Sequence, residues 1–332
     1  RQPNAWGKPV SFDAKLVQAI LWNIIGKTGD SGTLKIDNVR LLRKLPEMKE
    51  EVVVVSKVIL PVTQKIVREV SDKVTIADWY NFNKAAYSLT FDDGLISQTK
   101  YVAPVLDKYK IKATFYIVSE TLENDSTKTP AWRYGYWHQF LKLYANGHEL
   151  ASHTATHPKL TTLPDGKPTQ KGTLQYELRA PILALQKRIP NYKPVTFAYP
   201  FVDMNSHVSD EVEKLYISAR GLGAGINPKV PSQWMNVQAH AISYYGERTL
   251  ASDMQKITEL EKWIENNTIA RGGWSVFLAH DVMPFEQAIK ATDSWHPMSL
   301  ESVEAFAGWL AEKQSKNELW VATAEAVTKY IK

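Results

Sequence analysis

Short apolar stretches alternate with amphipathic stretches from about residue 85 to the end of this 332-residue chain. The apolar stretches have the length of buried strands, and the amphipathic ones place apolar residues at helical spacing. The strand-like stretches are 86–91, 113–118, 196–199, 274–279 and 319–322. The helix-like stretches between them are 99–109, 174–188, 209–215 and 300–313. This order predicts an α/β fold with a parallel sheet, and a (β/α) barrel suits the length. In such a barrel, reactive side chains follow the carboxyl ends of the strands.

The first 84 residues lack this alternation. Residues 31–42 read SGTLKIDNVRLL, a turn signal followed by a strand-like stretch that resembles the end of a β-sandwich. We therefore expect a β-rich segment at 1–45, a connector at 46–84 and the α/β domain at 85–332. The sequence begins at Arg1 with no apolar signal segment, as a processed chain would.

Composition argues against several classes of function. Lys and Arg total 40 against 35 Asp and Glu, and the basic residues are scattered, so we expect no nucleic-acid partner. No apolar run approaches the ~20 residues needed to cross a bilayer, so we expect no membrane span. The chain has no cysteine, which excludes disulfides, a thiolate nucleophile and thiolate metal ligands.

Polar residues follow two of these strand-like stretches and the short stretch at 148–151. Asp92 and Asp93 end the first, and two adjacent carboxylates repel each other unless a cation or a shared proton offsets their charge. His153 and His157 share a spacing that suits a metal if they lie on one face of a helical turn. His280 follows the apolar run at 274–279, where an imidazole can act as a general acid.

Each of these features alone has an ordinary explanation. An Asp-Gly pair is often a plain turn, two histidines four residues apart are often unrelated, and a lone histidine is often structural. Together, at strand ends of one domain, they indicate a hydrolytic metal centre with an open position for water.

The same residues resemble the polysaccharide deacetylase family, also called the NodB-homology domain or carbohydrate esterase family 4. TFDDG at 90–94 is similar to the family's first motif, and HTATHP at 153–158 to its second, H-(S/T)-x-x-H. The flanking segments IKATFYIV, NGHELAS and ELWVATAEAVTKYI are also similar, so the likeness extends from about residue 85 to the end. It implies a distorted (β/α) barrel. The N-terminal stretch is similar to the end of a glycan-binding sandwich found beside carbohydrate enzymes.

The resemblance also implies roles for particular residues. Asp92 corresponds to the catalytic base, and His280, in a Leu-x-His motif, corresponds to the general acid. The metal ligands would be Asp93, His153 and His157, holding a divalent metal, zinc first, with cobalt or nickel possible.

Two motifs depart from the family pattern. In the third, R-x-P-Y-G, an Arg orients the catalytic Asp; Ala198 occupies its place, so another cation replaces it or Asp92 is less well positioned. Phe201 stands at the Tyr position, where its backbone N–H is expected to bind the oxyanion. The fourth motif, an Asp and a Trp beside the acid His, has no clear counterpart near 234–240.

The leading hypothesis is a metal-dependent hydrolase that removes acetyl groups from a polysaccharide or oligosaccharide. Acetyl esters of xylan-type glycans and N-acetyl groups of chitin or peptidoglycan-type glycans both remain open. The alternative is a catalytically impaired glycan-binding protein on the same fold, which the missing Arg favours. A glycan substrate implies an extracellular, periplasmic or cell-surface location.

Overall fold

The computed structural model describes residues 77–124, 126–130, 133–242, 247–291 and 297–332. The expected β-rich segment at 1–45 and most of the connector at 46–84 lie outside these residues. The strands are β1 (Ala85–Asp93), β2 (Thr114–Ile117), β3 (Glu149–Ser152), β4 (Thr196–Ala198), β5 (Ser218–Arg220), β6 (Ile226–Asn227), β7 (Ala239–His240), β8 (Trp274–Ala279), β9 (Val282–Met283), β10 (Met298–Ser299) and β11 (Leu319–Val321).

Helices connect most of these strands. The α-helices are α1 (Ala103–Lys108), α2 (Trp137–Ala145), α3 (Leu174–Gln186), α4 (Ser206–Glu213), α5 (Leu250–Ile264), α6 (Phe285–Ala288), α7 (Leu300–Ser315) and α8 (Ala324–Ile331). Shorter helical turns are η2 (Tyr80–Phe82), η3 (Gln98–Val102), η4 (Leu160–Thr162), η5 (Pro200–Val202), η6 (Trp234–Asn236) and η7 (Glu265–Ile269). All nine predicted elements are present, with their ends displaced by a few residues at most. The short strands β3 and β5 and the helices α2 and α5 were not among them.

The main sheet is parallel and strongly curled. Its strands run in the order β5-β4-β3-β2-β1-β8-β6, with β11 also paired to β1 and β7 to β8. Only β6 pairs antiparallel within this sheet, to β8. The far edges meet through a single bridge, in which Val237 donates to the Ala219 carbonyl and Gly221 donates to the Val237 carbonyl. The predicted distorted (β/α) barrel is therefore confirmed, and the distortion is this narrow closure.

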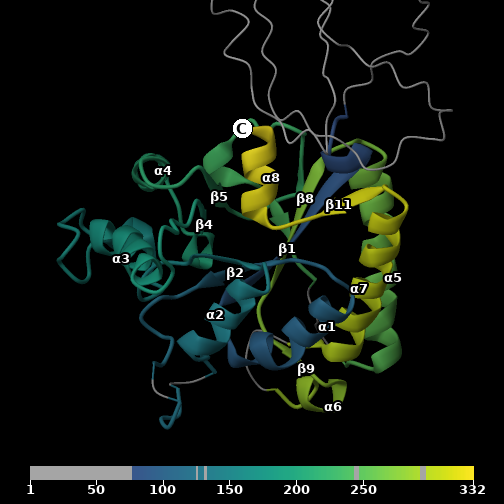
Figure 1. Cartoon of the computed structure of the whole chain (residues 1–332), viewed down its shortest axis with the longest axis horizontal. Helices are drawn as coiled ribbons and strands as arrows, with labels where there is room; N and C mark the ends of the chain where they lie inside the picture. Colours follow the sequence, from purple (N-terminus) through teal and green to yellow (C-terminus); the bar gives the residue numbers. More distant parts are fainter. Residues whose placement is uncertain (1–76, 125, 131–132, 243–246, 292–296) are drawn as a thin grey trace, which may run out of the picture. The chain divides into compact units, whose positions relative to one another are not determined.

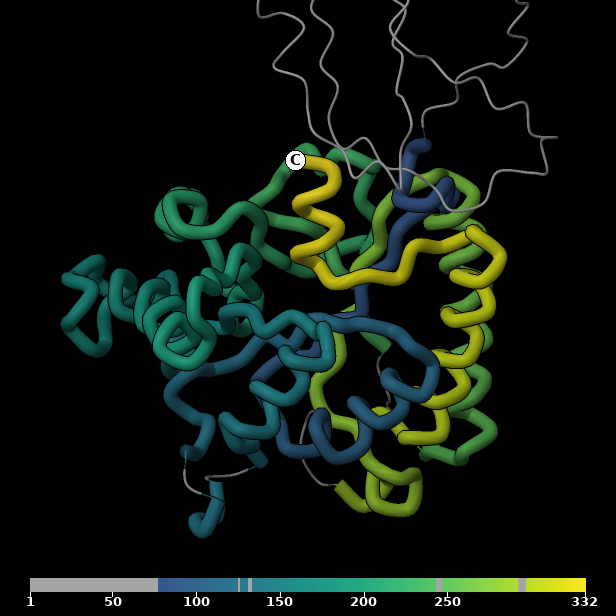
Figure 2. Tube along the Cα trace, viewed as in Figure 1, coloured from purple at the N-terminus to yellow at the C-terminus, as the bar shows by residue number. Residues whose placement is uncertain are grey.

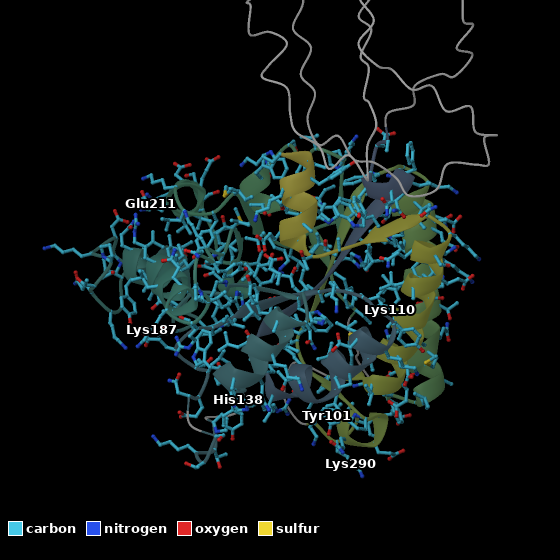
Figure 3. All side chains as sticks on the ribbon, in the orientation of Figure 1. Tyr101, Lys110, His138, Lys187, Glu211 and Lys290 are labelled. Atoms are coloured by element: carbon cyan, nitrogen blue, oxygen red, sulfur yellow. The ribbon has the colours of Figure 1, made fainter. Side chains whose placement is uncertain are left out.

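The helices cover the outside of the curled sheet. In Figure 1, α5 and α7 lie side by side along one flank, while α3 and α4 lie on the opposite flank. The larger apolar core fills the space between the outer face of the sheet and the helices, with Phe115, Phe140 and Phe306 fully or almost fully buried. Long charged side chains such as Lys187 and Lys290 lie on the outside of the molecule (Figure 3).

Helix α8 packs against the amino-terminal side of the sheet, as the yellow end of the trace shows (Figure 2). Its first backbone N–H groups donate to strand side chains, Ala324 to Thr114 Oγ1 at 2.8 Å and Glu325 to Glu149 Oε2 at 2.9 Å. Glu149 is almost completely buried there. Ala324 and Val327 of α8 also pack in a buried apolar cluster with Trp79 and Trp274. The helix therefore covers this end of the sheet, whereas the candidate site lies at the carboxyl ends of the strands.

Candidate metal and catalytic site

Asp92 and Asp93 lie side by side at the carboxyl end of β1. A regular strand points successive side chains to opposite faces, which would send the two carboxylates apart. Asp93 instead has a φ of 76°, in the left-handed region that non-glycine residues rarely adopt. Both carboxylates consequently lie near His153, whose Nε2 is 3.7 Å from Asp92 Oδ2 and 3.5 Å from Asp93 Oδ1.

His153 and His157 lie on the loop that follows β3. The sequence spacing suggested one turn of helix, but the segment is irregular, with positive φ at Thr154 (67°) and His157 (65°). Thr154 Oγ1 accepts a hydrogen bond from the His157 backbone N–H at 2.9 Å. The loop nevertheless brings His157 to the same place as His153, since His157 Nε2 lies 3.4 Å from Asp93 Oδ1.

Asp93, His153 and His157 form a cluster with the properties of a metal site. One ligand atom from each lies within 4.8 Å of the others. His153 Nδ1 donates to the Ala198 carbonyl at 2.8 Å, which leaves the Nε2 lone pair available to a metal. Burial lowers the pKa of His153 to about 3, so the imidazole is neutral at ordinary pH.

The buried charge of Asp93 is only partly compensated within the protein. Burial, together with the charge of Asp92, raises the pKa of Asp93 to about 7. Asp92 Oδ1 and Asp93 Oδ1 are buried without a hydrogen-bond partner among the described residues. A divalent cation would supply the missing positive charge, and two imidazole nitrogens with one carboxylate oxygen are a donor set that suits zinc.

Asp92 forms a buried ion pair with Arg220, the last residue of β5. Burial alone raises the pKa of Asp92, but Arg220, with His153 and His280, holds it below its usual value. The guanidinium also lies 5.3 Å from the centre of the Tyr116 ring. Arg220 was missed in the sequence, although it obeys the same rule as the other residues by standing at a strand end.

His280 follows β8 and shares a hydrogen-bonding partner with Asp92. The side-chain amide of Gln98 donates both to the Asp92 carbonyl and, at 3.1 Å, to the His280 carbonyl. Gln98 is fully buried and thereby joins the ends of β1 and β8. Burial lowers the pKa of His280, while the charges of Asp92 and Asp281 oppose that shift.

Phe201 lies at the rim of the cluster, after β4. Its φ is 56°, and its ring is 4.6 Å from the His157 ring in an edge-on arrangement. About half of its surface, 52%, is exposed, so the residue is open to a ligand.

The segment at 234–240, where the fourth motif was sought, places His240 in a packing contact. His240 is hydrogen bonded to Tyr87 and packs 4.6 Å from the Trp263 ring, in the outer core. Asp281, which follows His280 in the chain, is almost completely buried and forms an ion pair with Arg133.

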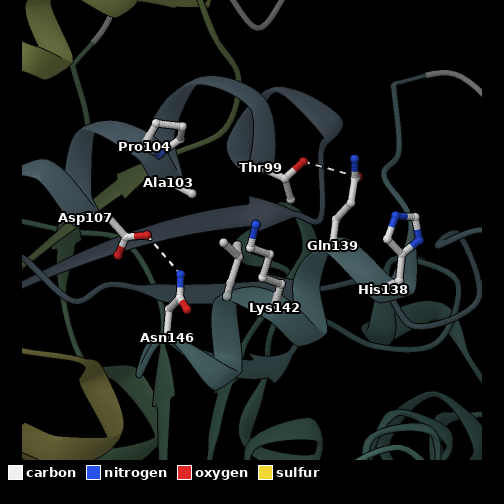
Figure 4. Close-up of a pocket in the computed structure, with 9 residues that line it drawn as sticks. Thr99, Ala103, Pro104, Asp107, His138, Gln139, Lys142 and Asn146 are labelled. Atoms are coloured by element: carbon white, nitrogen blue, oxygen red, sulfur yellow. Dashed lines mark hydrogen bonds between the residues drawn. The ribbon is translucent and has the colours of Figure 1, made fainter.

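A hollow of about 350 Å³ lies between α1 and α2, away from the cluster (Figure 4). Asp107 faces Asn146 there, with a 3.0 Å hydrogen bond, and Thr99 donates to Gln139 at 3.2 Å. These polar groups bind one another, and none of the cluster residues lines this hollow.

Residues 80–219 match the family model for polysaccharide deacetylases. The predicted resemblance to this family is therefore confirmed over residues 80–219. Among the described residues, no helix is long and apolar enough to cross a membrane.

Individual relatives are similar over half of the chain or less. A gellan lyase of a Bacillus species is 28% identical over 167 residues, which cover 50% of this chain and 6% of that protein. A peptidoglycan-N-acetylglucosamine deacetylase of Bacillus cereus is 37% identical over 83 residues, or 24% of this chain and 25% of that protein. The chain thus spans at most a quarter of the length of these two relatives.

The fold also resembles solved structures. A Mycobacterium smegmatis protein assigned to the polysaccharide deacetylases superposes with a TM-score of 0.50 at 15% identity, over 76% of this chain and 92% of that one. This similarity supports the barrel architecture alone.

Proposed function

We propose that this domain is a metal-dependent deacetylase acting on an acetylated polysaccharide or oligosaccharide. The observation that carries the proposal is the cluster of Asp93, His153 and His157 beside the Asp92–Arg220 ion pair. A purely structural metal site would not need a second carboxylate held ionised next to its ligands.

Asp93, His153 and His157 would hold the metal. Zinc fits the two imidazoles and one carboxylate, and cobalt or nickel accepts the same donors. When bound, such a cation polarises a carbonyl and lowers the pKa of a water molecule.

Asp92 is the proposed general base. Its low pKa keeps it ionised at neutral pH, and Arg220 fixes the carboxylate so that one oxygen can accept a proton from the attacking water. Ala198 stands where the family motif has an Arg that orients the catalytic Asp. In this proposal Arg220, at the end of β5, supplies that cation instead.

His280 is the proposed acid for the leaving group. The Gln98 amide donates to the backbone carbonyls of both His280 and Asp92, which fixes the two residues relative to each other. Cleavage of the acetyl C–O or C–N bond requires a proton on the departing sugar oxygen or nitrogen, which an imidazolium can give. The Phe201 backbone N–H is proposed to bind the carbonyl oxygen as negative charge develops on it.

The substrate class follows from the family, and the acetyl linkage is left for experiment. A substrate of this kind lies outside the cytoplasm, so we propose an extracellular, periplasmic or cell-surface location.

The test measures acetate release by zinc- or cobalt-loaded protein from acetylated xylan and from N-acetylated chitooligosaccharides, with Asp92→Asn as the blank. Release from one substrate establishes the enzyme and the linkage. Failure on both, with stoichiometric metal bound, would favour the glycan-binding alternative.

A further inference from the structure

The loop between the two histidines is held in a conformation that the chain would not adopt unaided. Thr154 and His157 both have positive φ, and residues held in sparsely populated backbone regions cost about 1–3 kcal/mol each. Surrounding contacts must therefore stabilise this conformation.

A buried carboxylate on another element supplies several of those contacts. Glu177, in the first turn of α3, has only 1% of its surface exposed. Its Oε2 accepts hydrogen bonds from the backbone N–H groups of Ala155 (2.9 Å) and Thr156 (2.8 Å). Its Oε1 accepts a third from Thr156 Oγ1 at 2.9 Å.

The opposite side of the same loop is bound by the segment after β2. The Ser119 N–H donates to the Thr154 carbonyl at 3.1 Å, and the Glu120 N–H donates to the Ala155 carbonyl at 2.9 Å. The carbonyls of Thr154 and Ala155 are thus satisfied by backbone N–H groups, whereas the N–H groups of Ala155 and Thr156 depend on the Glu177 side chain.

No lysine, arginine or histidine forms an ion pair with Glu177 in the described part of the chain. Its three donors all belong to Ala155 and Thr156, the residues directly between Thr154 and the ligand His157. Because its two oxygens accept three hydrogen bonds from adjacent residues, Glu177 is suited to imposing one loop conformation.

We propose that Glu177 is a positioning residue for the metal site, which presets His153 and His157 in the metal-free protein. This inference rests on the proposed metal site. Glu177 acts through Ala155 and Thr156, which donate its hydrogen bonds, and not as a ligand itself.

Three substitutions separate hydrogen bonding from charge. Glu177→Ala removes all three acceptors, and we expect metal affinity to fall about 10- to 100-fold, the usual effect of losing a partner that orients ligands. In Glu177→Gln the amide oxygen can accept both N–H groups while its NH₂ donates to Thr156 Oγ1, so we expect affinity within about threefold of wild type. Glu177→Asp keeps the charge but is one methylene short, and we expect at least about tenfold weakening.

Glu149→Ala is the matched control. Glu149 is also a buried glutamate with three donors, Thr114 Oγ1, Thr196 Oγ1 and the Glu325 N–H, but it lies at the opposite end of β3. We expect this substitution to lower the melting temperature without changing metal affinity.

The measurements are zinc affinity by competition with a chromophoric chelator, the visible spectrum of the cobalt form, and the melting temperature of the metal-free protein. Wild-type affinity and an unchanged cobalt spectrum in Glu177→Ala would overturn the inference, as would equal weakening in Glu149→Ala. If Glu177→Ala does not fold, wild-type affinity and an unchanged cobalt spectrum in Glu177→Asp would overturn the inference instead. Absence of metal binding by the wild type would instead refute the metal site itself.

Discussion

Asp92 on β1 and Arg220 on β5 form a buried ion pair although 128 positions separate them in the chain. The two strands are not neighbours, because β2, β3 and β4 lie between them in the sheet. Only the curl of the sheet brings their carboxyl ends together. The ion pair therefore links the closure of the barrel to the charge state of the proposed base.

Replacing Arg220 should damage both stability and turnover. Arg220→Met leaves Asp92 buried without its partner, and breaking such a pair costs about 3–5 kcal/mol of unfolding free energy. The variant should retain stoichiometric metal, since Arg220 is not a proposed ligand, while kcat/KM falls at least about 100-fold. Urea unfolding and metal analysis check the two effects.

The double variant Asp92→Asn, Arg220→Met should be more stable than the sum of the single losses predicts. Strict additivity would mean that the pair does not interact.

Asp92 and His153 should be distinguishable by what each substitution removes. Asp92→Asn should lower turnover by about 100- to 10,000-fold while metal stays bound, because the amide cannot accept the proton. His153→Ala should lose metal and activity together. Metal content by mass spectrometry and acetate release measure both properties, and near-normal rates in Asp92→Asn would show that another group is the base.

Metal should stabilise the fold. A ligand that binds only the folded state adds about 2.7 kcal/mol at a concentration one hundred times its Kd. Removing the metal with a chelator should lower the melting temperature by several degrees, and restoring zinc should reverse the change. His157→Ala, which removes one proposed ligand, should show a much smaller response, whereas His207→Ala on the surface should respond like wild type. An equal response from His157→Ala would place the metal elsewhere.

His148 should make the metal-free protein sensitive to acid. Burial lowers the pKa of His148 to about 4, from an ordinary value near 6.5. The unfolded chain therefore takes up this proton first as pH falls, so folding free energy is lost between pH 6.5 and 4 and is unaffected above that range. Between pH 6.5 and 5 the loss from this group is on the order of 2 kcal/mol.

His148→Asn tests the assignment. His148 Nδ1 accepts a hydrogen bond from the Ala113 N–H at 3.1 Å, and an asparagine oxygen can take the same place without titrating. Urea unfolding at pH 6.5 and 5 should show a smaller loss in this variant. The exposed His207→Asn should keep the full loss, and an unchanged slope in His148→Asn would assign the acid sensitivity to other groups.

Much of the architecture was readable from local patterns. The run at 274–279 became β8 with the predicted bounds, and the stretch at 300–313 became most of α7. Strands β3 and β5 were harder to recognise because their sequences, ELAS and SAR, contain few large apolar residues. The same lack of an apolar run concealed Arg220, which ends β5.

The residues singled out for chemistry came from motifs, and the structure brings several of them together. Asp93, His153 and His157 each place one ligand atom within 4.8 Å of the others, although the helical turn expected for the histidines is a loop. Their proposed roles stay predictions until metal binding and turnover are measured.

The sequence by itself determined the alternation of strands and helices and the placing of Asp92, His153 and His280 at strand ends, because both depend on short-range order along the chain. The tertiary structure alone decided that Arg220 pairs with Asp92, that Gln98 joins Asp92 to His280, and that Glu177 holds the loop between the histidines. These contacts depend on the curl of the sheet and on how α3 packs against it. Neither is encoded in any short stretch of residues, because both arise from the burial of apolar surface across the whole domain.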